Sequence, residues 1–287
     1  MKISIVPNRE KDVGLHYTSE LLSIIKAFDS DVVLSDEFSS LSALNGRIQF
    51  VPEEKVYQNV DFLIVLGGDG TIMRAARRAA LKDIPLLGIN LGRLGYLAEL
   101  EKNELNMIES LIRGNYKIEE RMMLDVRIEK EDGTVIELPP AFNDAVISTG
   151  YLPRIVEISL SCETLPMKKY RADGLIISTP SGSTAYSLAA GGPLIDPSMK
   201  AFCITPVSPQ SLCDKPIIFP DHLPLVFRVS PSRYADEHVL ITIDGTECIE
   251  LSPTDTVRVT RSPYVTRMVK IKNNNFFNIL HNKMSEI

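Results

Sequence analysis

Hydrophobic positions divide the chain into two regions with different periodicities. From residue 1 to about residue 115, short continuous apolar runs alternate with stretches whose apolar residues recur every three or four positions. Continuous runs predict buried strands, and the longer period predicts amphipathic helices. The expected strands are residues 2–6, 32–34, 62–66 and 85–89, and the expected helices are 19–28, 72–81 and 103–112. Strands that are apolar on both faces and alternate with helices indicate a parallel sheet covered on both sides.

After Gly114 the pattern changes to strict alternation of apolar and polar residues. Residues 123–138 alternate around Asp132-Gly133, which is typical of a β-hairpin. Similar runs follow at 154–161, 223–230, 239–244 and 256–261, with helical patterns at 183–192 and 275–284. The predicted fold is a Rossmann-like α/β domain at 1–115 and a mostly antiparallel, β-sandwich-like domain at 116–265. Residues 266–287 are expected to pack back on the first domain.

Composition narrows the function classes. Hydrophobic residues make up 44% of the chain and charged residues 24%, as in ordinary soluble globular proteins. The net charge of −6 argues against a nucleic-acid partner. No apolar run approaches the roughly 20 residues that a membrane-spanning helix needs. The four cysteines lack a C-x-x-C pair and are expected to be reduced and buried, which predicts a cytoplasmic protein.

The segment from Gly67 to Thr71, "GGDGT", joins the strand at 62–66 to the helix at 72–81. Ligands of open α/β sheets bind at such strand ends, where glycines allow close backbone approach and helix amides favour phosphate. The segment matches neither the Walker pattern nor G-x-G-x-x-G. The negative charge of Asp69 would repel a phosphate, so a carboxylate at this position indicates a group that accepts a proton or binds a metal. The alternative is an ordinary Asp-Gly turn, with Thr71 capping the helix.

Two further stretches carry candidate chemistry. Residues 180–184, "PSGST", follow the strand-like 175–179 and combine hydroxyls with free amides, which suits a ribose-phosphate or amide-bearing ligand. Asn143 and Asp144 place an amide beside a carboxylate, which suits the paired hydroxyls of a ribose. The alternatives are a Ser/Thr-capped helix and a strand-end turn.

Taken in order, these motifs resemble those of the NAD kinase family. The resemblance rests on the motifs "GGDGT", "ND" and "DGLIISTPSGSTAYSLAAGGP", together with "GINLGRLGYLAEL" and "ITPVSPQSLCDKPII". The likeness runs from about Lys2 to Val259. It implies transfer of a phosphoryl group from ATP, or in some members polyphosphate, to the adenosine-ribose 2′-hydroxyl of NAD, which gives NADP. It also implies Mg²⁺ as cofactor and assembly as a homodimer or homotetramer.

The resemblance also implies roles for individual residues. Asp69 would accept the proton, because a ribose hydroxyl is a poor nucleophile until a positioned carboxylate takes its proton. Magnesium would be held mainly by nucleotide phosphates rather than by a protein cage. The residues implied to bind NAD or nucleotide are Gly70, Arg74, Asn143, Asp144, Arg154, Arg171, Asp173, Thr184, Ala185, Tyr186, Ser187, Leu188, Ala189 and Thr246.

The chain departs from the family pattern at three positions. Asp144 replaces the usual glutamate, Thr246 a common glutamine, and Gln210 a usual histidine. Two other functions share part of the pattern. A lipid or diacylglycerol-type kinase has "GGDGT" but gives residues 178–193 no role, and a non-catalytic NAD(P)-binding sensor has no evident need for Asp69. The choice between ATP and polyphosphate, or between NAD and NADH, stays open.

Overall fold

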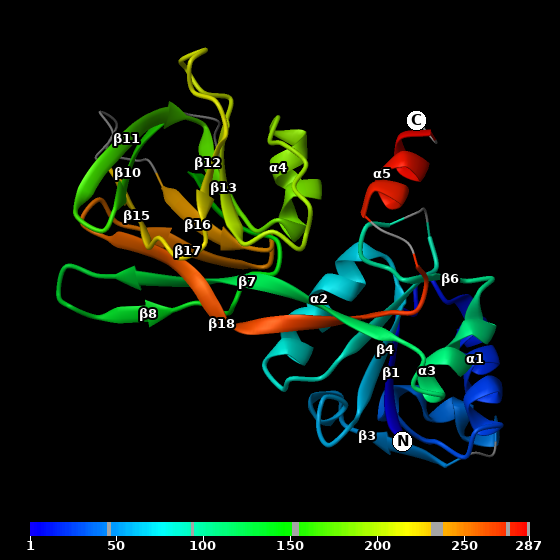
Figure 1. Cartoon of the computed structure of the whole chain (residues 1–287). Coiled ribbons are helices and arrows are strands. Elements are labelled where there is room, and N and C mark those ends of the chain that lie inside the picture. Colours follow the sequence, from blue (N-terminus) through cyan, green and yellow to red (C-terminus); the bar gives the residue numbers. More distant parts are fainter. Residues whose placement is uncertain (45–46, 93–94, 151–154, 231–237, 274–275, 286–287) are drawn as a thin grey trace. The chain divides into compact units, whose positions relative to one another are not determined.

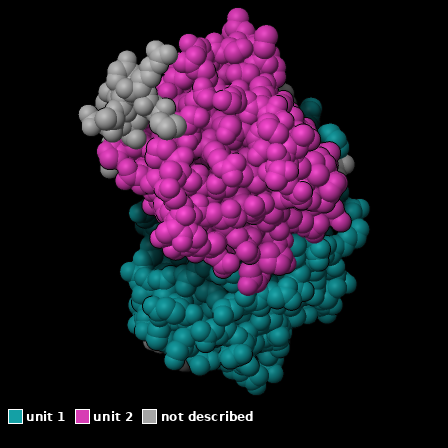
Figure 2. Space-filling view, turned by 90° about the vertical axis from the view of Figure 1, so that its left-hand side faces the viewer, with its two compact units in different colours: residues 1–121, 265–287 teal, residues 122–264 magenta. Residues whose placement is uncertain are grey.

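The chain folds into two compact units, shown in the computed structural model (Figure 1; Figure 2). The structure describes residues 1–44, 47–92, 95–150, 155–230, 238–273 and 276–285. Unit 1 comprises Met1–Arg121 and Val265–Ile287, and unit 2 comprises Met122–Tyr264. Two long strands run through both units: β7 (Lys117–Glu129) and β18 (Thr256–Lys270).

Unit 1 is built on a parallel sheet in the order β18-β5-β4-β1-β2-β3, with β6 beside β5. The strands are β1 (Lys2–Pro7), β2 (Asp31–Ser35), β3 (Ile48–Val51), β4 (Phe62–Gly67), β5 (Leu86–Asn90) and β6 (Leu100–Glu101). The α-helices are α1 (His16–Lys26), α2 (Asp69–Ala80), α3 (Ile108–Ile112) and α5 (Phe276–Ser285). Short 3-10 turns are η1 (Val13–Leu15), η2 (Asp36–Leu44), η3 (Glu53–Lys55) and η4 (Leu105–Met107).

The parallel sheet expected for the first region is therefore confirmed, and so are its four expected strands. All six residues of β4 are buried, as a continuous apolar run predicts for a strand covered on both faces. The helix expected at 103–112 is shorter than its pattern indicated. It consists of the turn η4 followed by the five-residue helix α3, and its buried residues are Leu105, Ile108 and Leu111.

The register of the sheet brings the ends of three strands to one edge. Gly67 at the end of β4 pairs with Asn90 at the end of β5, and Pro7 at the end of β1 pairs with Leu66. The loops that follow β1, β4 and β5 therefore leave the sheet as neighbours. In open α/β sheets this carboxyl edge is where ligands bind.

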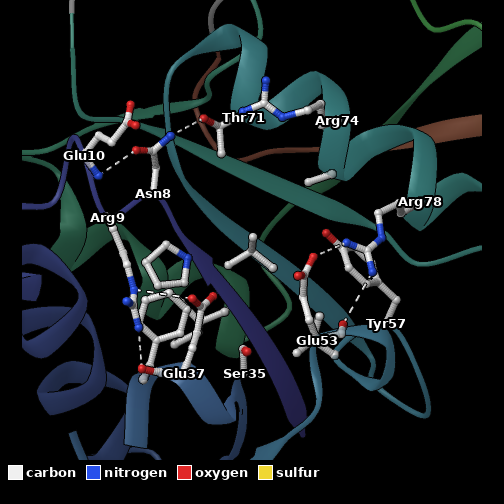
Figure 3. Close-up of a pocket in the computed structure, with 16 residues that line it drawn as sticks. Asn8, Arg9, Glu10, Ser35, Glu37, Glu53, Tyr57, Thr71, Arg74 and Arg78 are labelled. Carbon is white, nitrogen blue, oxygen red and sulfur yellow. Dashed lines mark hydrogen bonds and ion pairs between the residues drawn. The ribbon is translucent and has the colours of Figure 1, made fainter. Parts of the chain in front are cut away.

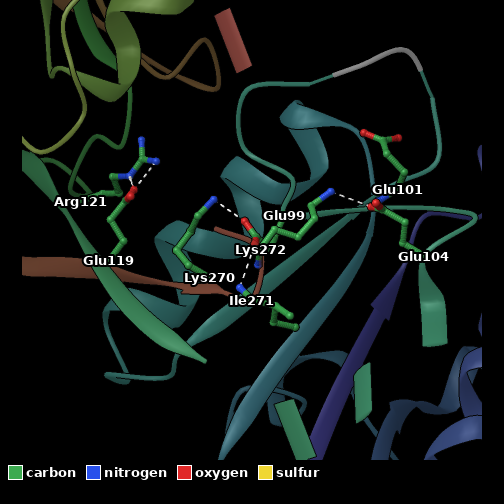
Figure 4. Close-up of polar contacts among 8 residues, drawn as sticks. All are labelled: Glu99, Glu101, Glu104, Glu119, Arg121, Lys270, Ile271 and Lys272. Atoms are coloured by element: carbon green, nitrogen blue, oxygen red, sulfur yellow. Dashed lines mark hydrogen bonds and ion pairs between the residues drawn. The ribbon is translucent and has the colours of Figure 1, made fainter. Parts of the chain in front are cut away.

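Glu99 fixes the last part of β18 in unit 1 (Figure 4). This buried carboxylate accepts hydrogen bonds from the backbone amides of Ile271 (2.8 Å) and Lys272 (2.6 Å) and forms an ion pair with Lys270. The ammonium of Lys272 in turn contacts Glu104 at 2.7 Å. Because a buried charge is stable only when it is paired and hydrogen-bonded, these contacts explain how a carboxylate is tolerated at this position.

Unit 2 consists of two sheets that share one hydrophobic core. One sheet contains β7 and β18 with β8 (Val135–Glu137), β10 (Val156–Cys162), β11 (Leu165–Ala172) and β15 (Leu225–Val229). The other has the order β14-β13-β12-β9-β16-β17, and all its pairings are antiparallel. Its strands are β9 (Asp144–Thr149), β12 (Gly174–Ser178), β13 (Ala201–Val207), β14 (Ile217–Pro220), β16 (Val239–Ile243) and β17 (Glu247–Leu251).

Side chains from both sheets of unit 2 meet in that core, including Ile158 and Phe227 from the first sheet and Ile147 and Ile177 from the second. The sandwich-like second region is therefore confirmed. A 3-10 turn η5 (Ser181–Thr184) and the short helix α4 (Tyr186–Ala189) follow β12. Among the described residues, no helix is long and apolar enough to cross a membrane.

The cysteines only partly follow expectation. All four are free thiols. Only Cys203 is buried, whereas Cys162 is half-buried and Cys213 and Cys248 are exposed, so the prediction that all four are buried was wrong. The physical reason is strand alternation: Cys248 occupies an outward-facing position of the exposed strand β17.

Candidate active site

The glycine-rich loop of unit 1 connects buried β4 to helix α2. The helix begins at Asp69, three residues before the periodic pattern indicated, and Gly68 precedes it in an extended conformation without a side-chain cap. Thr71 does not cap the helix, so that alternative was wrong. Its hydroxyl oxygen accepts a hydrogen bond from the Asn8 amide nitrogen at 2.8 Å, which ties the loop after β1 to the start of α2.

The Asp69 carboxylate is held in one orientation by the loop that follows Gly95. Its two oxygens accept hydrogen bonds from the backbone amides of Tyr96 (2.8 Å) and Leu97 (3.3 Å). A β carbon on Gly95 would collide with the same carboxylate, so only glycine allows this approach. Burial and the charge of Asp69 together raise the pKa of the Tyr96 hydroxyl. Asp69 itself stays half-exposed, and its oxygens keep lone pairs for a further donor.

Gly70 and Arg74, which the resemblance implied to bind nucleotide, lie one turn apart on α2. A terminal nitrogen of the Arg74 guanidinium is 3.7 Å from the position that a β carbon on Gly70 would take. Arg74 is exposed. The structure thus places a cation directly over the glycine loop, where the resemblance implied a contact with phosphates.

Beside the loop, unit 1 contains a pocket of about 480 Å³ (Figure 3). The ends of β1 and β2, the turn η3 and one face of α2 line it. Arg78 on that face contacts Glu53 at 2.6 Å, and its guanidinium lies 4.2 Å from the centre of the Tyr57 ring. Tyr57 is buried, and burial raises the pKa of its hydroxyl. Arg78 is therefore engaged with one wall of the pocket and is not simply solvated.

In unit 2, Asn143 and Asp144 lie at the start of β9, where a third residue positions them. The buried carboxylate of Asp244 accepts hydrogen bonds from the backbone amides of Phe142 (2.8 Å), Asn143 (2.8 Å) and Asp144 (3.0 Å). Asp244 lies in the turn between β16 and β17 with a positive φ of 48°. The sequence analysis missed it, although an Asp-Gly turn directly after an alternating strand was visible.

Asp144 is itself almost fully buried, with 5% of its surface exposed. Its carboxylate accepts no hydrogen bond from the residues that the structure describes, and the charge of Asp244 is close. Burial, and secondarily that neighbouring charge, raise its pKa from 3.8 to about 7. A carboxyl group with this pKa changes its charge in the physiological range, which perturbed carboxylates at functional sites often do.

The hydroxyl-rich segment after β12 packs against the Asn143 backbone. The carbonyl of Asn143 accepts the Thr179 amide at 2.8 Å, and a β carbon on Gly182 would collide with that carbonyl. Ser187 is fully buried and its hydroxyl already pairs with Thr205 at 2.9 Å. Thr184 and Ala185 are half-buried, while Tyr186, Leu188 and Ala189 are exposed. A ligand can therefore reach most of this segment, but not the Ser187 hydroxyl.

The remaining predicted residues are spread over unit 2. Thr246 belongs to the same turn as Asp244 and is exposed. Exposed Arg171 and half-buried Asp173 precede Gly174, at the other end of β12 from the Asn143 group. That strand spans roughly 13 Å at about 3.3 Å per residue, so only an extended ligand or two ligands could contact both ends. Arg154 lies outside the described residues.

Among the residues that the structure describes, the side chains offer no preformed metal site. Within the described ranges, no group of three or more histidine, cysteine, aspartate or glutamate side chains could hold a metal ion. A divalent cation would have to take most of its ligands from a bound nucleotide and water, as Mg²⁺ commonly does.

An open parallel sheet with a glycine loop at its carboxyl edge, joined to a β-sandwich with a hydroxyl-rich turn, defines a nucleotide-binding phosphotransferase. Residues 3–116 match the ATP-NAD kinase N-terminal domain and residues 142–271 match the ATP-NAD kinase C-terminal domain. The chain belongs to the NAD kinase family.

Individual relatives agree with this assignment over nearly the whole chain. The chain is 37% identical to an NAD kinase of Symbiobacterium thermophilum over 285 residues, which cover 99% of both chains. It is also 37% identical to an NAD kinase of Natranaerobius thermophilus, over 99% of this chain and 97% of that one. Its fold is similar to yeast NADH kinase complexed with NADH, with a TM-score of 0.86 at 22% identity, covering 99% of this chain and 87% of that chain. An Archaeoglobus fulgidus NAD kinase in complex with ATP gives a TM-score of 0.74 at 21% identity, with both chains fully covered.

Proposed function

We propose that the protein phosphorylates the 2′-hydroxyl of the adenosine ribose of NAD, with ATP or polyphosphate as donor, and so produces NADP. A bond forms between the ribose oxygen and the transferred phosphorus, and the bond from that phosphorus to the bridging oxygen of the donor breaks, so that ADP, or a polyphosphate shortened by one unit, leaves. The hydroxyl proton passes to a carboxylate. A base that takes this proton as the bond forms typically contributes about 10²- to 10⁴-fold to the rate.

The observation that carries the proposal is the position of Asp69. Its carboxylate lies on the glycine loop, half-exposed, with the amides of Tyr96 and Leu97 fixing both oxygens. A base must be oriented before the reaction, because disorder at the reacting atoms lowers the rate. Gly68 and Gly70 on either side allow a nucleotide to approach closely.

Unit 2 supplies the dinucleotide side of the proposal. We assign phosphate transfer to the domain at 1–115 and the NAD site to the domain at 116–265, with the C-terminal segment 266–287 packing on the first. Asn143 and Asp144 would hold ribose hydroxyls, and the exposed part of residues 184–189 would contact nicotinamide and ribose. Arg154, Arg171, Asp173 and Thr246 would line the rest of the dinucleotide site.

Several finer statements belong to the same proposal. Mg²⁺ carried by the phosphates would offset the roughly four negative charges of a triphosphate. The protein would act in the cytoplasm as a homodimer or homotetramer. A subunit partner would also help to explain why Arg171 and Asp173 lie at the far end of β12 from Asn143.

The test is NADP formation from NAD by the purified chain with ATP and Mg²⁺, or with polyphosphate. We expect turnover that stops when the metal is chelated and resumes when Mg²⁺ is added back. Saturable NAD binding without product from either donor would instead favour a non-catalytic sensor, in which Asp69 only anchors the loop at residues 95–97.

A further inference from the structure

The ammonium group of Lys11 lies over the glycine loop. A β carbon on Gly68 would collide with it, and a β carbon on Gly92 would lie 3.2 Å from the same nitrogen. Lys11 follows β1, Gly68 follows β4 and Gly92 follows β5, and these three strands end at one edge of the sheet. The ammonium at the end of this flexible side chain thus lies beside two glycines from different loops.

The turn that presents Lys11 is fixed at both ends. The Asn8 side-chain oxygen accepts the backbone amides of Glu10 and Lys11, both at 3.1 Å, while its nitrogen donates to Thr71. At the other end, buried Asp12 accepts the amides of Tyr17 and Thr18, both at 2.9 Å, at the start of α1. The backbone of Lys11 is therefore anchored to both helices that flank the loop.

The Lys11 ammonium has no polar partner among the described residues. No carboxylate, carbonyl or hydroxyl in the described ranges accepts a hydrogen bond from it, and it forms no ion pair there. The Lys11 side chain is exposed, and its ammonium lies beside the backbone of Gly68, next to Asp69.

We propose that Lys11 binds the phosphoryl group that is transferred, opposite Arg74. The inference rests on the proposed function, since it assigns the donor side of the same reaction. Arg74 lies over Gly70 and Lys11 over Gly68, so the two cations flank the residue that would act as base. An anion brought beside Asp69 needs this compensation, because the carboxylate would otherwise repel it.

The donor, and not NAD, is the expected partner of Lys11. The phosphoryl group in transfer must lie within bonding reach of the hydroxyl whose proton Asp69 takes, and Gly68 is the residue next to Asp69. A compact ammonium with three rotatable donors suits a tetrahedral phosphate that moves during the reaction.

The test compares Lys11→Met with Lys82→Met, an exposed lysine just beyond α2 that serves as the charge-matched control. A hydrogen bond between charged groups corresponds to about 10- to 150-fold in affinity. We expect Lys11→Met to lower kcat/KM for ATP-Mg²⁺ by that factor, while the Kd for NAD from calorimetry stays within twofold. Lys82→Met should match the wild type in both measurements.

Three results would overturn the proposal. They are a kcat/KM for ATP within twofold of wild type in Lys11→Met, an equal loss of ATP and NAD affinity, or a loss confined to NAD. Direct titration of ATP-Mg²⁺ into both variants separates this inference from the proposed function. If the wild type makes no NADP, the proposed function fails, and the Lys11 assignment then stands or falls on whether Lys11→Met weakens ATP-Mg²⁺ binding.

Discussion

Two aspartates, one in each unit, both accept hydrogen bonds from the backbone amides of a distant loop, but they differ in exposure. Asp69 accepts backbone amides at 96 and 97, and Asp244 accepts those at 142, 143 and 144. Asp69 fixes the loop that follows Gly95, and Asp244 fixes the loop that carries Asn143 and Asp144. Asp69 is half-exposed with accessible oxygens, whereas Asp244 is 8% exposed and engaged by three amides. Bonds to amides alone therefore do not distinguish the proposed base from a structural carboxylate, whereas exposure separates the two.

The comparison assigns different chemistry to the two carboxylates. The amides of Tyr96 and Leu97 orient the Asp69 carboxylate, which can still accept a proton. Asp244 holds the backbone of Asn143 and Asp144, and its charge, after burial, contributes to the raised pKa of the Asp144 carboxyl. We therefore treat Asp244 as a positioning residue.

The largest expected effect is on turnover in Asp69→Asn. The amide keeps one acceptor for the loop at 96–97 but cannot take a proton. We expect kcat to fall by about 10²- to 10⁴-fold, which corresponds to roughly 3 to 5.5 kcal/mol of barrier. Thermal unfolding should show a loss of only about 1 kcal/mol, since one hydrogen bond is affected. A variant with kcat within threefold of wild type would leave Asp69 as a loop anchor only.

The sequence predicted the sheet and the glycine loop because both depend on local signals. The continuous run at 62–66 and the glycines that follow have a meaning that needs no distant partner. It did not predict that Thr71 would pair with Asn8, that Gly95 would lie against Asp69, or that Asp244 would hold residues 142–144. Each of these contacts joins segments more than 20 residues apart, and only the register of the strands brings them together.

Asp244→Ala should have the second largest effect, and it should appear in stability first. The amides of Phe142 and Asp144 are buried, and each would lose its acceptor at a cost of roughly 2 kcal/mol. We expect a decrease of about 4 kcal/mol in the free energy of unfolding, measured by denaturant titration. NAD affinity should fall as well, because Asn143 and Asp144 are no longer held. Thr246→Ala, in the same turn but exposed, is the control and should change stability by less than about 0.5 kcal/mol. Unchanged stability in Asp244→Ala would contradict the positioning role.

The buried Asp144 predicts a pH dependence of stability. Its pKa is about 7 in the folded chain against an ordinary value of 3.8, so the folded state holds its proton more tightly than the unfolded state does. The contribution of this group is fully present below pH 3.8 and is lost as pH rises to about 7 and above. The full shift corresponds to about 4 kcal/mol, and Asp144→Asn should recover roughly 2 to 3 kcal/mol at pH 8. The gain should shrink toward pH 5, as followed by unfolding at several pH values. A gain that does not vary with pH would show that the carboxyl group ionises normally.

The smallest expected effect concerns NAD binding, and it tests whether NAD contacts Asp144. If its carboxylate accepts a ribose hydroxyl, a bond of this kind corresponds to roughly 1.5 to 3 kcal/mol. Asp144→Ala should then weaken NAD binding by about 10- to 150-fold, with little change in ATP affinity. Asp144→Glu, which restores the residue usual in the family, should retain NAD binding if the site has room for one more methylene. The same contact predicts a pH dependence of NAD binding. The ionised carboxylate of Asp144 only accepts hydrogen bonds, so the affinity of the wild type for NAD should rise between pH 6 and pH 8. Asp144→Ala should abolish that rise. Calorimetric titration of NAD at both pH values gives all of these quantities. Equal NAD affinity in wild type and Asp144→Ala at both pH values would remove this residue from the site and leave its burial to be explained by the packing of β9 alone.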